Sequence, residues 1–84
     1  NVKLMVDFHN RWSPPFHEAH RALRSGETGA AKFVRLWMAN TTLVPFKMLS
    51  WAARSSSLWF LGSHTIDLVC WLIGEWPVRV YAVA

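Results

Sequence analysis

The residues best suited to chemistry are a histidine and an aspartate set one helical turn apart in an apolar helix. His64 and Asp67 lie in SSSLWFLGSHTIDLVCWLIGEW, residues 55–76, whose apolar spacing predicts a helix. At about 100° per residue, both share a face with Phe60 and Trp71. A histidine oriented by a carboxylate and shielded by aromatic rings suits general acid–base catalysis. The alternative is a histidine that is hydrogen-bonded at a packing interface, with Asp67 holding it.

Three further groups of residues give weaker signals. His17 and His20 lie in HEAH, one residue shorter than the H-E-x-x-H zinc motif, and no third ligand is evident, so we expect no metal site. Cys70 has no basic neighbour in sequence that would activate its thiol, and we expect it to be inert. Tryptophan and arginine alternate in RW, VRLW and WAAR, which could stack on nucleic-acid bases, but Trp37 and Trp51 are more economically explained as core residues.

Strand and helix patterns alternate along the chain around these residues. In chain order we expect a strand over residues 2–9, a helix from Pro14 that stops at Gly26, a strand over 30–40 that is buried on both sides, an irregular loop with a short helix near 48–53, the helix that closes at Gly74, and a strand over 78–83. The order is β-α-β, loop, α-β. It predicts part of a larger α+β domain in which helices pack on an open sheet.

The composition is rich in apolar side chains for so short a chain. Of 84 residues, 52% are hydrophobic, and these include six tryptophans and five phenylalanines. A monomer of this size would struggle to bury them all. The sequence also begins at Asn1 and ends at Ala84 in strand-like runs. We therefore interpret the chain as a fragment whose apolar surface faces another domain or subunit.

The charge pattern argues against a nucleic acid or a membrane as the partner. A formal net charge of +4 admits a small basic, tryptophan-rich module that binds nucleic acid or anionic lipid, and this is the alternative function. The nine Lys and Arg residues are scattered, however, so we expect neither partner. No apolar run approaches the roughly 18–20 residues of a membrane span. The single Cys70 fits a reducing compartment, so we expect a cytoplasmic protein.

Two segments resemble a known family of enzymes. LWFLGSHTIDLVCWLIGEWPVRVYA, residues 58–82, is similar to the G-x-H-x-x-D-x-x-x-W-L-x-G segment of the Gfo/Idh/MocA oxidoreductases, the family of glucose-fructose oxidoreductase and inositol dehydrogenase. VDFHNRWSPPFHEAHRALRSGETGAAKFVR, residues 6–35, resembles the start of the same family's second domain. The two segments keep their order and spacing, so the resemblance covers nearly the whole chain.

The resemblance implies an NAD(P)-dependent parent enzyme that acts on sugars, polyols or related alcohols and carbonyls. Residues 1–84 would be the opening part of its C-terminal domain, which supplies substrate contacts and a sheet that forms a homo-oligomer. The NAD or NADP would be bound mainly by a missing N-terminal Rossmann domain, which the helix face with His64 would meet. The fragment alone would be inactive and bind no cofactor. Its residues contain neither G-x-G-x-x-G nor a P-loop.

The resemblance also implies roles for individual residues. His64 matches the family's active-site histidine, which works with a lysine of the missing domain. His9, Asn10 and Asp67 match positions around the substrate pocket, and Asp67 is a structural aspartate that could orient the His64 ring. Phe60 stands where many members carry a carboxylate, four residues before the histidine. Phe60 leaves three alternatives for the parent enzyme. It belongs to a divergent branch of the family that relies on His64 and the lysine of the missing domain, it acts on a bulkier and less polar substrate, or it has lost dehydrogenase activity.

Overall fold

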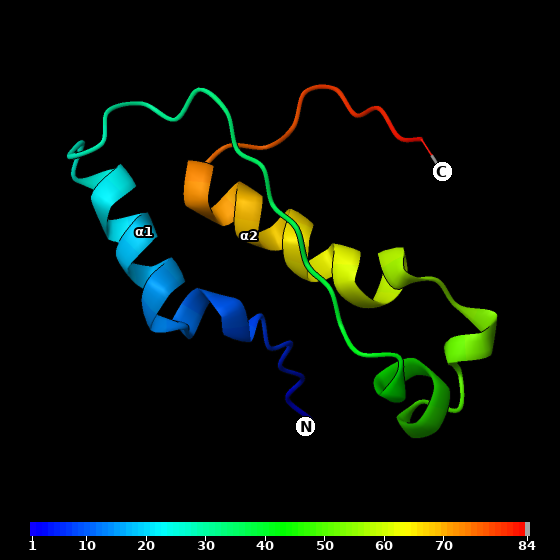
Figure 1. Ribbon diagram of the computed structural model, residues 1–84. Coiled ribbons are helices and arrows are strands. Elements are labelled where there is room, and N and C mark those ends of the chain that lie inside the picture. Colours follow the sequence, from blue (N-terminus) through cyan, green and yellow to red (C-terminus); the bar gives the residue numbers. More distant parts are fainter. Residues whose placement is uncertain (84) are drawn as a thin grey trace.

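The computed structural model describes residues 1–83, except for the side chain of Ala53. The regular elements of these residues are two α-helices and four short helical turns (Figure 1). In chain order they are η1 (His9–Trp12), α1 (Pro14–Arg24), η2 (Val44–Met48), η3 (Ala52–Arg54), η4 (Leu58–Gly62) and α2 (Ser63–Ile73). The turns η1 and η3 are 3₁₀-helical, whereas η2 and η4 are π-helical. The two α-helices pack against each other.

Helix α1 begins and ends close to where the sequence predicts. Two prolines occupy its first positions, where a missing N–H costs nothing, and the Ser13 carbonyl accepts a 2.9 Å hydrogen bond from the His17 N–H. The spacing of Phe16, Ala19, His20 and Leu23 predicts one covered face of this helix, and all of them except Ala19, which is exposed, are half-buried. This face packs on α2.

Helix α2 continues from η4 without a break, as the long apolar helix predicts, and it ends at Gly74. This glycine adopts φ 79°, in the left-handed region, and its N–H donates a 2.8 Å hydrogen bond to the Cys70 carbonyl. Leu68 and Leu72 of α2 are the only buried hydrophobic side chains in the part of the chain that is described. The core is therefore a small contact between two helices.

Gly74 also leaves room for a side chain of α1. A Cβ atom built on Gly74 would overlap the Arg24 guanidinium, whereas one built on Gly29 would meet nothing within 4 Å. Both glycines have a positive φ, 79° and 73°. We expect Gly74→Ala to lower the free energy of unfolding by about 1–3 kcal/mol through backbone strain, because the flexible end of Arg24 can move away from an added Cβ atom. The matched control, Gly29→Ala, carries the same strain with no neighbour within 4 Å, so a much larger loss for Gly74→Ala in urea unfolding would contradict this expectation.

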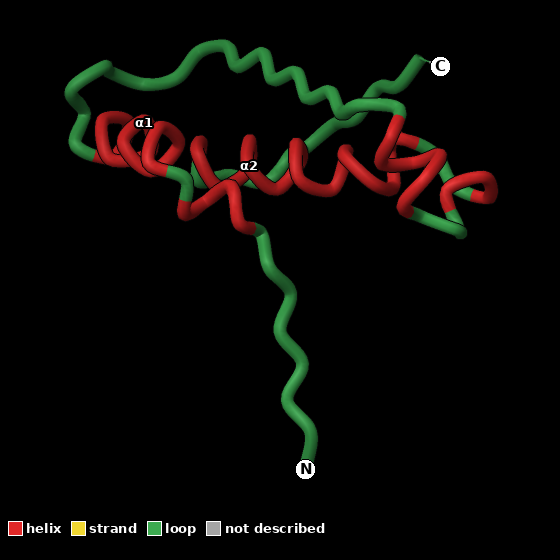
Figure 2. The backbone as a smooth tube through the Cα atoms, turned by 60° about the horizontal axis from the view of Figure 1, so that its bottom comes forward, coloured by secondary structure: helices red, strands yellow, loops and turns green. Residues whose placement is uncertain are grey.

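The predicted α+β class and its open sheet are wrong. Residues 1–83 contain no strand, and no backbone hydrogen bonds join the segments 2–9, 30–40 and 78–83 (Figure 2). A strand is stable only when a neighbouring strand pairs its N–H and C=O groups, and the three segments do not lie side by side. The first runs away from the helices, while the second crosses α2. The alternating apolar patterns that predicted strands are local, and they do not predict which segments pair with each other.

The second of these segments alternates in exposure. Val34, Leu36 and Met38 are half-buried, whereas Phe33 and Trp37 are each 84% exposed. The prediction that this segment is buried on both sides, with Trp37 in a core, is therefore wrong. Only one of its two faces is covered by the chain.

The fold leaves most apolar side chains uncovered. The radius of gyration is 15.5 Å, against about 12 Å for a compact domain of this length. The accessible surface is 7839 Å², against about 5,100 Å² for a compact monomer of this mass. An open apolar trough of about 580 Å³ is lined by one face of α2 together with Leu36, Val78 and Val80. Ile66 and Ile73 of α2 border this trough and stay exposed.

The two described α-helices are each too short to cross a lipid bilayer, and no other described helix is long and apolar enough to do so.

Candidate functional site

The face of α2 that carries His64 is covered in part by the chain's own residues 8–20. The His9 ring of η1 lies 5.3 Å from the His64 ring, and the Phe8 ring lies 6.0 Å from it, both edge to face. Further along α2, His20 of α1 stacks on Trp71. The expectation that this face meets a separate cofactor-binding domain stays a prediction. Within the chain, η1 and α1 contact part of the face, and η1 brings two predicted site residues, His9 and His64, together.

His64 has a buried ring nitrogen without a hydrogen-bond partner. Its Nδ1 atom is enclosed, and no partner for it is found among the described residues. Buried polar atoms are nearly always hydrogen-bonded, because leaving one unpaired costs about 1–3 kcal/mol. Such an atom is therefore a feature that needs a reason, and a catalytic role is one of the reasons that recur.

Asp67 is paired with Arg11 of η1, not with His64. The Arg11 Nε–H donates a 2.9 Å hydrogen bond to one carboxylate oxygen of Asp67, and the Nη2–H donates a second bond to the other oxygen. The Asp67 side chain is 11% exposed and that of Arg11 is 40% exposed. Hydrogen bonds with Asp67 raise the pKa of the Arg11 guanidinium. This bidentate pair fastens η1 to α2 and so sets the position of His9 beside His64.

The ion pair should contribute measurably to the packing of η1 on α2. Asp67→Asn leaves one acceptor for Arg11, and we expect a loss of about 1 kcal/mol in the free energy of unfolding, a low value because Arg11 is partly solvated. Glu18→Gln is the matched control, since Glu18 forms a comparable but exposed pair with Arg21 of α1. Urea unfolding should show little change for the control. A loss as large as that of Asp67→Asn would contradict the role given to the Arg11–Asp67 pair.

His20 of α1 stacks on Trp71 of α2, and its hydrogen bond with Arg24 requires a neutral imidazole ring. Its ring lies parallel to the Trp71 indole, with centroids 4.1 Å apart and an interplanar angle of 6°. Its Nε2 accepts a 3.4 Å hydrogen bond from the Arg24 Nε–H, which requires an unprotonated nitrogen. Burial and the positive charges of Arg24 and His17 lower the pKa of His20 below 6.5.

This lowered pKa predicts a loss of stability in acid. Because folded His20 binds its proton less readily than unfolded His20, stability is greatest above the unfolded pKa of 6.5 and declines as the pH falls through the folded pKa. We expect the melting temperature to fall over this window. His20→Phe keeps a ring against Trp71 but should lose this part of the pH dependence. His17→Gln removes only the smallest of the three causes and should retain most of it, and the opposite pattern would contradict the assignment to His20.

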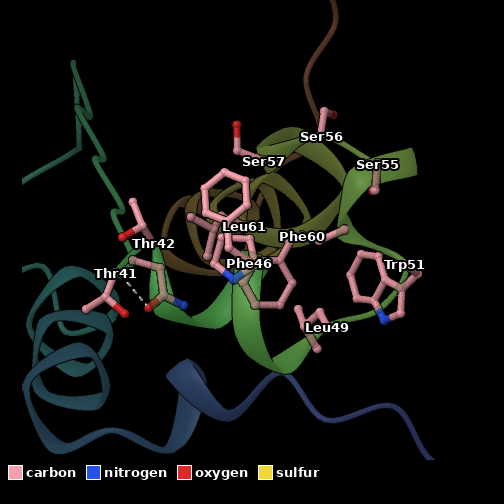
Figure 3. A pocket seen from close by; sticks show the side chains of 13 residues that line it. Thr41, Thr42, Phe46, Leu49, Trp51, Ser55, Ser56, Ser57, Phe60 and Leu61 are labelled. Carbon is pink, nitrogen blue, oxygen red and sulfur yellow. Dashed lines mark hydrogen bonds between the residues drawn. The ribbon is translucent and has the colours of Figure 1, made fainter.

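Phe60 does not lie with His64 but turns into a separate hollow (Figure 3). Its ring meets the Trp51 ring edge to face at 6.0 Å, and both line this hollow together with Leu61. Phe60 belongs to the π-turn η4, which takes more residues per turn than an α-helix. A regular helical wheel therefore misplaces it relative to His64.

Asn10 lies in η1, and the described chain offers no group of side chains that could hold a metal ion. The Asn10 carbonyl accepts a 3.2 Å hydrogen bond from the Ser13 N–H, which closes η1, and its side chain makes no hydrogen bond within residues 1–83. No group of three or more His, Cys, Asp or Glu side chains that could hold a metal ion is found in the described chain. Asn10 therefore directly follows His9 on the turn that packs beside His64.

Sequence reasoning missed two residues that organise this site. Arg11 is 56 residues away from Asp67 in the chain, and nothing in the local pattern pairs the two. Its only signal was its place in the aromatic–polar–Arg–aromatic stretch shared with the resembling family. Trp51 was interpreted as a core residue, but it is 43% exposed and lines the hollow beside Phe60.

Comparisons with known proteins show what this chain is similar to. The family described as GFO/IDH/MocA C-terminal domain matches residues 16–84. Inositol 2-dehydrogenase from Rhizobium meliloti (strain 1021) is 30% identical over 84 residues, which are 99% of this chain and 24% of that protein. The chain thus spans about a quarter of the length of this relative. No solved structure matches the chain significantly.

Proposed function

The chain belongs to the GFO/IDH/MocA family, and on this premise we propose that it is part of the C-terminal domain of an NAD(P)-dependent oxidoreductase acting on sugars, polyols or related alcohols and carbonyls. The observation that carries the proposal is His64, whose buried Nδ1 lacks a partner and whose ring lies beside His9. The family resemblance, which implies an active-site histidine at this position, supports the proposal. The similarity to an inositol 2-dehydrogenase favours an oxidoreductase over the alternative of a basic, tryptophan-rich binding module.

In the proposed reaction His64 handles the proton of the substrate hydroxyl. Because Nδ1 is enclosed, Nε2 would be the nitrogen that meets the substrate, and His9 and Asn10 of η1 would contact the substrate beside it. Asp67 acts indirectly, since Arg11 engages both of its carboxylate oxygens and the pair holds η1 against α2. The bound nicotinamide would supply hydride transfer.

The cofactor and the uncovered surface both require residues beyond these 84. Residues 1–84 contain no glycine-rich phosphate loop, so the dinucleotide would be held by a separate N-terminal domain. We propose that this domain, or a second copy of the enzyme in a homo-oligomer, covers the exposed apolar side chains along α2. A cytoplasmic location is supported by Cys70, which forms no disulfide in the described chain.

Calorimetric titration with NADH and NADPH tests whether a domain outside residues 1–84 binds the cofactor. The complete polypeptide that contains residues 1–84 should bind NADH or NADPH, whereas the 84-residue piece should bind neither and should show no turnover. Clear NADH binding by the piece alone would contradict the assignment of the cofactor to another domain. Failure of the complete polypeptide to bind either dinucleotide would contradict an NAD(P)-dependent enzyme.

A further inference from the structure

A hollow of about 300 Å³ lies between η2, η3 and η4, and its lining includes none of His9, Asn10 and His64 (Figure 3). Its apolar wall consists of aromatic and aliphatic side chains: Phe46, Leu49, Trp51, Phe60 and Leu61. Hydroxyl groups border this wall: Thr41, Thr42, Ser55, Ser56 and Ser57. An apolar centre with a polar rim is the usual arrangement of a protein–protein interface, where an anchoring side chain fills a pocket.

The turns that form the hollow also expose large apolar side chains to solvent. Phe46 lines the hollow and is nevertheless 78% exposed. Met48 of η2 and Leu58 and Trp59 of η4 are exposed as well. Aromatic residues and methionine are enriched at the centres of protein interfaces, whereas carboxylates are depleted there. Exposed apolar side chains that gather around a hollow therefore favour an interaction surface.

The charges of the chain are divided unevenly, and the hollow lies on the basic side of this division. Residues 28–66, which contain all three turns, carry four Lys or Arg residues and no Asp or Glu. The rest of the chain carries five of each sign, so the whole formal net charge of +4 lies in residues 28–66. Lys47 of η2 and Arg54 of η3 are exposed and form no ion pair with any residue of 1–83. An acidic partner fits this charge, whereas the same region of a second copy would repel it.

The size and form of these turns favour a protein segment over a membrane or a nucleic acid. Membrane-surface binding uses a helix with an apolar face and a cationic face, whereas η2 and η4 have five residues each and η3 has three. Nucleic acids require a cation for each phosphate that is neutralised, and the three turns carry only Lys47 and Arg54. A cavity of roughly 150 Å³ holds benzene in another protein, so a hollow of about 300 Å³ has room for one aromatic or leucine side chain.

We propose that this hollow is the docking site for an acidic segment of a partner protein, which inserts one aromatic or leucine side chain against the Trp51 and Phe60 rings. The lining is uncharged and receives the apolar anchor. Lys47 and Arg54 belong to η2 and η3 but do not line the hollow, and they would pair with carboxylates on either side of the anchor. Docking does not depend on the catalytic role of His64, because His64 does not border the hollow.

The test is fluorescence anisotropy of labelled peptides with the complete polypeptide that contains residues 1–84. The probes are an aspartate-rich peptide with one central tryptophan, the same peptide with serine in place of the tryptophan, and a lysine-rich peptide with the tryptophan. The first should bind at least about tenfold more tightly than the other two, because only it offers both the anchor and the carboxylates. Its affinity should fall as the salt concentration rises, because salt screens exposed charges.

Variants with matched controls assign this binding to the hollow. Trp51→Ala should weaken binding of the first peptide at least about fivefold, because it removes part of the apolar wall. Trp37→Ala is its control, because Trp37 is exposed and lies outside the hollow. Lys47→Glu should weaken binding at low salt about 3- to 10-fold. Lys3→Glu, which makes the same change in net charge on the exposed N-terminal segment, should have little effect.

Several results would overturn the docking site. These are equal binding of the tryptophan and serine peptides, a loss for Trp51→Ala no larger than that for Trp37→Ala, or equal losses for Lys47→Glu and Lys3→Glu. Tighter binding to phosphatidylserine vesicles or single-stranded DNA than to the first peptide, lost in Trp51→Ala, would overturn the assignment to a protein. Self-association in sedimentation that Trp51→Ala abolishes would show a second copy in the hollow and would also overturn it. The proposed function is tested separately, by dinucleotide binding and turnover.

Discussion

Replacement of His64 by glutamine is expected to lower the turnover number of the complete enzyme by about 10²- to 10⁴-fold, the usual contribution of a general acid–base. Glutamine keeps a polar side chain of similar length but cannot exchange a proton with a hydroxyl group near neutral pH. Because the effect lies in proton transfer, the affinity for NADH should stay close to that of the wild type. Steady-state kinetics and calorimetry on the same preparation measure both quantities.

His17→Gln provides the control for this loss. His17 is exposed on α1 and makes no hydrogen bond or ring contact with His64. The variant should therefore turn over at close to the wild-type rate. If His64→Gln retained wild-type turnover, or lost it only together with the fold, the catalytic role of His64 would be refuted and its unpaired Nδ1 would be a feature of packing alone.

Replacement of Leu68 by alanine is expected to lower the free energy of unfolding by about 2–5 kcal/mol. Leu68 is 0% exposed and lies at the centre of α2, on the side that faces away from solvent. Truncation removes buried methyl groups and leaves a cavity, and the small core offers few neighbours that could move in to fill it. Urea unfolding followed by circular dichroism measures the loss.

Ile66→Ala is the matched control for Leu68→Ala. Ile66 lies two residues away on the same helix but is 56% exposed, so its truncation removes less buried surface and leaves no enclosed cavity. We expect a loss of about 1 kcal/mol or less. Losses of equal size for the two variants would show that Leu68 is not the centre of the core.

The helices of this chain were predictable from sequence because their signals are local. The serine–proline start of α1 and the glycine end of α2 act through the bonds of neighbouring residues, and both helices end within a few residues of the predicted positions. The sheet was not predictable in the same way. The pattern of residues 30–40 predicted a strand buried on both sides, but Leu36 is half-buried and Trp37 is exposed, and the pattern carried no information about a pairing strand.

The residues of the candidate site stay a prediction, and the geometry that the structure gives them was foreseen only in part. His64 and His9 came from the resemblance, and the fold brings them together. The expected orientation of His64 by Asp67 is not seen, because a guanidinium from a distant part of the chain competes for the carboxylate and forms two hydrogen bonds with it. Such long-range pairs leave no periodic pattern in a sequence. The turn of Phe60 into its own hollow followed from the π-turn η4, which apolar spacing does not reveal.

The central claim is that this chain belongs to an enzyme that oxidises alcohols with a nicotinamide dinucleotide. Its most direct test is the rate at which the complete polypeptide reduces NAD or NADP in the presence of inositol, sorbitol, benzyl alcohol or cyclohexanol. We expect reduced dinucleotide to accumulate with at least one of these alcohols and to be consumed again with the corresponding carbonyl compound. A folded protein that reduces neither dinucleotide with any alcohol, and oxidises neither with any carbonyl, would contradict the claim.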